Sequence, residues 1–163
     1  FLYSLPDVFD EQFPTRANAF QFDTDTRNIF ICADSKRLLS AFLELLSNAA
    51  EADNSCGSIQ IHSHVNACGH TVPVSVTGKG SLSEINPSEM QTNPLIDADA
   101  PLTAQLSTPF FSTKENHAGL GLSIVAQVCH THHAGFELYS RNGFTTAGIT
   151  FPILAMDDMR NTI

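Results

Sequence analysis

Strand-like segments come in consecutive pairs in this chain, and that pairing restricts the sheet it can form. Alternating apolar and polar residues bounded by turn residues predict six strands: 19–24, 28–33, 58–65, 71–77, 135–141 and 147–153. Helical periodicity interrupts them at 34–52 and at 120–132. A parallel sheet needs a helix between successive strands, which this order lacks. We therefore expect an α/β two-layer sandwich with a mixed, mainly antiparallel sheet and helices on one face.

The first helical segment has the clearest amphipathic pattern in the chain. Asp34 or Ser35 can cap its N-terminus. Apolar residues repeat every three or four positions along one face: Leu38, Phe42, Leu45, Leu46 and Ala49. Glu44 and Asn48 are one turn apart on the opposite face. Judged by periodicity alone, this polar row is the solvent-facing side of the helix.

Two glycines mark the start of the second helical segment. Gly119 and Gly121 flank Leu120 where the loop becomes a helix. Glycine lets the backbone approach a ligand closely, and the first N–H groups of a helix have no partner within it. Together with the helix dipole, these groups favour a phosphate, and Lys114 upstream adds a positive charge. A plain glycine-rich helix start with a surface lysine fits the same residues equally well.

The composition indicates one globular domain that binds neither nucleic acid nor an anionic membrane. Hydrophobic residues make up 42% of the 163 residues and charged residues 15%. The net charge is −9 and the basic residues form no run, so the chain lacks a basic footprint. No apolar stretch approaches the roughly 18 residues of a membrane helix. The four cysteines have no CxxC spacing, which favours reduced thiols in the cytoplasm.

Three regions follow from composition along the chain. Residues 1–17 contain two prolines and mixed polarity, and we expect a linker remnant of a longer protein, because the chain begins at Phe1 rather than at methionine. We expect residues 18–155 to form the domain and 156–163 a C-terminal tail. Within the domain, 81–117 has weak periodicity and many loop-forming residues, typical of a lid over a functional site or of a disordered segment.

Seven histidines raise the question of a metal site. Cys129, His130, His132 and His133 gather at the end of the second helical segment, where cationic side chains also suit the helix dipole. Their spacing matches no structural zinc pattern. The sequence therefore favours an ordinary helix C-terminus over a zinc site.

Four short stretches occur in the order typical of one enzyme family. "FLELLSNAAEA" resembles the N-box of sensor histidine kinases, "VTGKG" their first glycine box, "PFFSTK" their F-box and "GLGLSIV" their second glycine box. The stretch from His130 to Ile153 also resembles the end of these domains. The resemblance covers residues 19–154 and is closest to nitrogen-regulation sensor kinases. It implies the catalytic ATP-binding domain, a Bergerat-type fold shared with gyrase, heat-shock chaperone and mismatch-repair ATPases.

The resemblance also implies roles for individual residues. Asn48 falls on the asparagine that holds Mg²⁺, and Glu44 on the acidic residue proposed to help deprotonate the accepting histidine. Lys114 falls on the residue that neutralises the terminal phosphate. The resemblance implies that the backbone of the second glycine box binds the triphosphate; its positions here are Gly119, Leu120, Gly121 and Leu122. It implies that the first glycine box lies beside the adenine; its positions here are Val76, Thr77, Gly78 and Gly80. Residues 81–117 correspond to the lid over ATP.

Two positions depart from the family pattern. Val76 stands where the first glycine box carries the aspartate that accepts a hydrogen bond from adenine, and Thr77 offers only a weaker, uncharged acceptor. His117 stands where the second box normally opens with another glycine. A degenerate domain that acts as a protein-interaction or regulatory module is therefore the alternative to an active kinase domain.

The expected function is phosphoryl transfer from ATP to a histidine in an upstream dimerisation domain, for relay to a response regulator. None of the seven histidines lies in a helical His-Glu or His-Asp motif of the phosphoacceptor kind. The acceptor is therefore expected outside this segment, which we place in the cytoplasm without direct membrane contact, whether or not the parent protein is membrane-anchored.

Overall fold

The computed structural model describes residues 1–14, 19–25, 29–52, 57–80 and 119–154. Helices and strands follow one another in the order η1 (Leu2–Ser4), α1 (Leu5–Gln12), β1 (Ala19–Thr24), α2 (Ser35–Ala52), β2 (Ser58–Ser63), β3 (Thr71–Lys79), α5 (Gly121–Thr131), β4 (Gly135–Arg141) and β5 (Phe144–Pro152).

The five described strands form one mixed sheet in the order β1-β2-β3-β5-β4. β1 and β2 are parallel, while β2–β3, β3–β5 and β5–β4 are antiparallel. The β4–β5 hairpin turns at Asn142 and Gly143, whose φ angles of 55° and 77° are typical of a tight hairpin turn. The expected mixed, mainly antiparallel sheet is confirmed.

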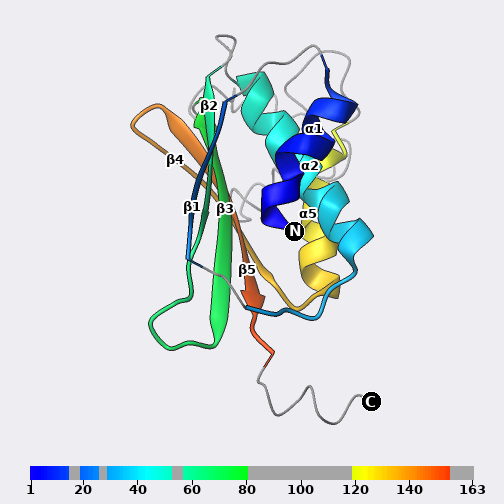
Figure 1. The fold of residues 1–163 in the computed structure, drawn as a ribbon, viewed down its shortest axis with the longest axis vertical. Helices are drawn as coiled ribbons and strands as arrows, with labels where there is room; N and C mark the ends of the chain where they lie inside the picture. Colours follow the sequence, from blue (N-terminus) through cyan, green and yellow to red (C-terminus); the bar gives the residue numbers. More distant parts are fainter. Residues whose placement is uncertain (15–18, 26–28, 53–56, 81–118, 155–163) are drawn as a thin grey trace, which may run out of the picture.

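The three α-helices of the described residues, α1, α2 and α5, cover one face of this sheet, as Figure 1 shows, and the core lies between the two layers. The sheet contributes side chains at every second position, because alternate residues of a strand face opposite sides. Buried examples are Ile59, Ile61, Val72, Val74, Val76, Ile149 and Phe151. The predicted apolar stripe of α2 meets them with Leu38, Phe42, Leu45 and Leu46, all buried. Ala49 lies at the half-buried margin of that stripe.

Asp34, rather than Ser35, caps the N-terminus of α2. Its carboxylate accepts hydrogen bonds from the backbone N–H groups of Lys36 (2.9 Å) and Arg37 (3.2 Å). These bonds lower the pKa of the Asp34 carboxyl below its ordinary value, because they stabilise its charged form. The bond from the Arg37 N–H has the largest effect.

The expectation of a strand at 28–33 is wrong. Residues 29–33 lie outside any strand, although Ile29 and Ile31 alternate with polar or exposed neighbours and pack against the core. Residues 1–17, for which we expected a linker remnant, contain two elements that the sequence patterns did not predict, η1 and α1. α1 forms because Leu5 and Phe9 are one turn apart and both are fully buried, with Pro6 in the first turn, where proline is tolerated.

Candidate functional site

The polar row of α2 meets the beginning of α5 at Gly121. An ideal Cβ built on Gly121 would lie 2.6 Å from Glu44 Oε2 and 3.8 Å from Asn48 Nδ2. Glycine is therefore the residue that lets α5 start this close to α2 while both polar side chains stay in place. Glu44 and Asn48 are half-buried, so this face of α2 is not simply the solvent side that periodicity suggested. We call Glu44, Asn48 and residues 119–122 the α2–α5 junction.

The start of α5 presents backbone N–H groups at this junction. Gly119 has a φ of 66°, a left-handed conformation that suits glycine, and Leu120 occupies the N-cap position without a side-chain cap. The first N–H groups of the helix therefore lack the capping partner that Ser, Thr, Asp or Asn would give. The first turn of α5 itself carries no acidic residue. The nearby carboxylate is that of Glu44, which comes from α2.

The end of β3 packs closely against α2, the helix that carries Glu44 and Asn48. An ideal Cβ on Gly78 would lie 2.8 Å from Ala49 Cβ, and one on Gly80 would lie 2.8 Å from Ala52 Cβ. Gly80 also has a φ of 148°, which favours glycine. Since Ala49 follows Asn48 in sequence, the first glycine box lies beside the C-terminal half of α2.

The two residues before Gly78 face opposite sides of the sheet. Val76 points toward the helices, is 2% exposed, and pairs with Ile61 on β2 and Ala147 on β5. Thr77 points away from the helices, and its hydroxyl shares a 2.8 Å hydrogen bond with the Thr146 hydroxyl. Thr77 is therefore not the substitute acceptor on the helix side that the sequence allowed, because a one-residue shift along a strand reverses the face.

The histidine-rich end of α5 serves a structural role. His132 Nε2 accepts a hydrogen bond from the Asp34 backbone N–H (2.9 Å), and its Nδ1 donates to the Val128 carbonyl (2.7 Å). These bonds fix one neutral tautomer and tie the end of α5 to the start of α2. Burial raises the pKa of the Cys129 thiol to about 11. Within the described residues, no three His, Cys, Asp or Glu side chains gather in a way that could hold a metal ion.

The sequence analysis named most of these residues but did not predict two contacts, that of His132 with Asp34 and that of β3 with α2. The His132–Asp34 contact joins residues far apart in sequence, and nothing local signals it. The close packing of β3 on α2 does have a signal, since small residues stand at 49 and 52 on the helix and at 78 and 80 at the end of β3 and just after it. Lys114, His117 and the expected lid lie outside the described residues.

Comparison with known proteins agrees with the resemblance found in the sequence motifs. Residues 33–155 match the family described as "Histidine kinase-, DNA gyrase B-, and HSP90-like ATPase". The chain is 33% identical over 127 residues to the sensory histidine kinase/phosphatase NtrB of Rhizobium leguminosarum bv. phaseoli, and 30% identical over 121 residues to NtrB of Rhodobacter capsulatus. These alignments cover 75% and 74% of this chain but 32% and 33% of the relatives. The chain thus spans about a third of their length.

Solved structures agree on the fold. The catalytic domain of the histidine kinase ThkA is similar with a TM-score of 0.69 and 26% identity, over 92% of this chain and 88% of that one. No helix among the described residues is long and apolar enough to cross a membrane. The match over 33–155 includes α2 and the start of α5, which form the α2–α5 junction, and also the end of β3. The chain belongs to the family of histidine kinase-, DNA gyrase B- and HSP90-like ATPases.

Proposed function

We propose that this chain is the ATP-binding catalytic domain of a two-component sensor histidine kinase. The observation that carries the proposal is the approach of Gly121 to Glu44 and Asn48, which brings the N-box and the second glycine box together. A helix N-terminus with glycine at its first positions suits the phosphates of a nucleotide. In this proposal the backbone of residues 119–122 binds the triphosphate, and Lys114 neutralises its terminal phosphate.

A magnesium ion fits the side chains at the junction. The Asn48 amide and the Glu44 carboxylate offer oxygen atoms, which Mg²⁺ prefers together with retained water molecules. Glu44 is negative and lies against the helix start where anionic phosphates are expected, so a cation there would relieve the repulsion between them. We assign Asn48 as the protein's ligand to the ion. When bound, the ion neutralises charge on the phosphates during phosphoryl transfer.

Glu44 is the proposed proton acceptor. In the transfer, an imidazole nitrogen of the accepting histidine forms a bond to the terminal phosphorus as the bond from phosphorus to the ADP oxygen breaks. The attacking imidazole loses its N–H proton, and a half-buried carboxylate beside the phosphates is suited to take it. The remaining protein groups position the reactants, which is the larger part of catalysis in phosphoryl transfer.

The wider context is also a proposal. The curated relatives are sensory histidine kinases about three times as long as the aligned region, and one solved structure shows ThkA in complex with the response regulator protein TrrA. ThkA in that complex is 25% identical to this chain. We infer that this chain works with an upstream dimerisation domain carrying the acceptor histidine, and with a response regulator.

One observation favours a second candidate, a degenerate domain that regulates through protein contacts. Val76 occupies the position of the adenine-binding aspartate and is enclosed by apolar neighbours. Loss of such a hydrogen bond costs on the order of 1.5–3 kcal/mol, or roughly ten- to a hundredfold in affinity. Weak nucleotide binding is therefore expected even if the domain is active.

Titration calorimetry with ADP and Mg²⁺ tests the proposal. We expect binding by the wild-type chain at micromolar to millimolar nucleotide, and at least a tenfold loss in Asn48→Ala. Gln127→Ala, an exposed amide on α5, is the matched control and should bind as the wild type does. Absence of binding at millimolar nucleotide in the wild type would favour the degenerate domain.

A further inference from the structure

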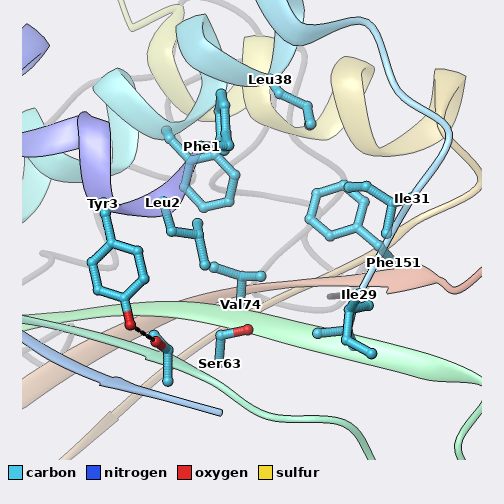
Figure 2. Close-up of a pocket in the computed structure, with 12 residues that line it drawn as sticks. Phe1, Leu2, Tyr3, Ile29, Ile31, Leu38, Ser63, Val74 and Phe151 are labelled. Atoms are coloured by element: carbon cyan, nitrogen blue, oxygen red, sulfur yellow. Dashed lines mark hydrogen bonds between the residues drawn. The ribbon is translucent and has the colours of Figure 1, made fainter. Parts of the chain in front are cut away.

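A hollow of about 300 Å³ lies between the layers at the N-terminal end of α2. Figure 2 shows Phe1 and Leu38 on the helical side, with Val74 and Ser63 on the sheet. None of the described residues that line it is a predicted nucleotide-site residue. Phe42 lines it from α2, and Glu44 is two positions on, so the two side chains point about 200° apart around the helix. The hollow is thus separate from the α2–α5 junction.

The lining limits the chemistry of any ligand. Among the described residues that line it, no side chain carries a formal charge, and most are aliphatic or aromatic. The polar side chains are Tyr3, Thr24 and Ser63, each with a hydroxyl group. The Tyr3 and Thr24 hydroxyls share a 2.6 Å hydrogen bond at one end, drawn as a dashed line in Figure 2. The described lining offers an anion such as a phosphate no cationic side chain, whereas it offers an apolar molecule a matching surface.

The hollow is larger than ordinary packing leaves. Protein interiors contain few voids bigger than a water molecule, and a mainly apolar hollow offers water few hydrogen-bonding partners. One wall also faces solvent, since Phe1 and Tyr3 are 53% and 57% exposed. Phe1 precedes a single 3-10 turn, η1, and Tyr3 lies within it. A ligand can therefore enter by displacing a short segment without opening the sheet.

We propose that this hollow binds a small, neutral, mainly apolar molecule about the size of a fused bicyclic ring. An apolar cavity of about 150 Å³ is enough for benzene, and this one is about 300 Å³. A single hydroxyl or N–H group on the ligand would face the end of the hollow where the Tyr3 and Thr24 hydroxyls lie. The proposal does not depend on nucleotide binding at the junction.

Indole is the probe for the test, because the 163-residue chain contains no tryptophan and so gives no indole fluorescence of its own. We expect saturable binding with a dissociation constant below about 1 mM. In NMR titrations the shifted backbone amides should be those of Val72, Val74 and Phe151 rather than those of residues 119–122. Benzoate, a charged aromatic of similar size, should bind at least tenfold more weakly.

Two variants fill the hollow and one serves as a control. Val74→Phe, on the sheet, and Ile29→Phe, in the 29–33 segment, should each weaken indole binding at least tenfold. Because they lie in different parts of the fold, one variant still tests the proposal if the other does not fold. Leu39→Phe adds to α2 the same bulk as Ile29→Phe adds, at a residue outside the described lining, and should bind indole as the wild type does. The proposal is overturned if indole fails to saturate, if benzoate binds equally well, or if both filled variants keep wild-type affinity.

Discussion

The Glu44 carboxylate occupies the space that a side chain at position 121 would need. An ideal Cβ on Gly121 would lie 2.6 Å from Glu44 Oε2, closer than non-bonded atoms approach. α5 therefore begins directly against the polar row of α2. A helix start that favours anions and a carboxylate from another helix lie side by side, which is the arrangement that a cation-bridged phosphate would complete.

Gly121→Ala should impair nucleotide binding much more than folding. The new methyl group meets the flexible end of Glu44, which can swing away, and alanine is favoured over glycine in a helix. We therefore expect the melting temperature to stay within a few degrees of the wild type. Affinity for ADP with Mg²⁺ should fall at least tenfold, because the displaced carboxylate crowds Asn48 and the start of α5. Calorimetry and thermal unfolding on the same samples separate the two effects.

Gly135→Ala is the control for this substitution. Its ideal Cβ would lie 3.8 Å from Thr150 Cβ, an ordinary contact on the far strand of the sheet. ADP binding should be unchanged. Wild-type affinity in Gly121→Ala itself would show that the phosphates do not approach this part of α5.

Gly78→Ala should destabilise the fold, because its methyl group meets the body of α2. The ideal Cβ would lie 2.8 Å from Ala49 Cβ and 3.1 Å from both Cα and the carbonyl oxygen of Ala49, and backbone atoms cannot swing aside. Overpacking of this kind costs about 1–3 kcal/mol in the free energy of unfolding. Urea titration monitored by circular dichroism measures the loss.

A double-mutant cycle tests the contact itself. Ala49→Gly alone should cost up to about 1 kcal/mol, because glycine weakens a helix interior. Combined with Gly78→Ala it removes one of the two colliding methyl groups, so the double variant should be at least about 0.5 kcal/mol more stable than additivity predicts. Strict additivity would contradict the close packing of β3 on α2.

Local sequence patterns predicted what depends on local physics. The stripe of Leu38 and Leu45 fixed the buried face of α2, and Asn142-Gly143 located the β4–β5 turn. The prediction of a strand around Ile29 and Ile31 was wrong, because alternation shows which side chains are buried but not whether a neighbouring strand supplies hydrogen bonds. α1 was missed because its apolar face rests on only two fully buried residues, Leu5 and Phe9, too few for a clear period.

The site was predictable in part. The motif resemblance named both the N-box and the second glycine box, and the structure brings them together, since an ideal Cβ on Gly121 would lie 2.6 Å from Glu44 Oε2. The face of Thr77 was also open to prediction, because its neighbours Val76 and Gly78 share the opposite face of a strand. The His132–Asp34 hydrogen bond was not, since it depends on how two helix ends meet in three dimensions.

Asp34→Ala should lower the melting temperature near neutral pH but not in strong acid. The folded pKa of Asp34 is lowered, chiefly by the hydrogen bond from the Arg37 N–H, so its unfolded pKa of about 4 is the higher of the two. The stabilisation is complete above that unfolded value and disappears as the pH falls through the folded value. The difference in melting temperature between wild type and variant should shrink accordingly.

Asp10→Ala, on the exposed face of α1, is the control for the Asp34 experiment. Thermal unfolding followed from pH 7 down to about pH 2 supplies the measurement for all three proteins. A difference between wild type and Asp34→Ala that stays constant over this range would mean that the carboxylate does not cap α2.

Val76→Asp should restore adenine recognition at a cost in stability. Val76 is 2% exposed on the helix-facing side of β3, so a carboxylate there is poorly solvated without nucleotide and should lower the free energy of unfolding by roughly 1–3 kcal/mol. With ADP bound, the charged acceptor gains a hydrogen bond, and affinity should rise tenfold or more. Val74→Asp, on the same face but two residues away, should be destabilised without that gain. Equal ADP affinities for both variants and the wild type, by calorimetry, would place adenine somewhere other than beside residue 76.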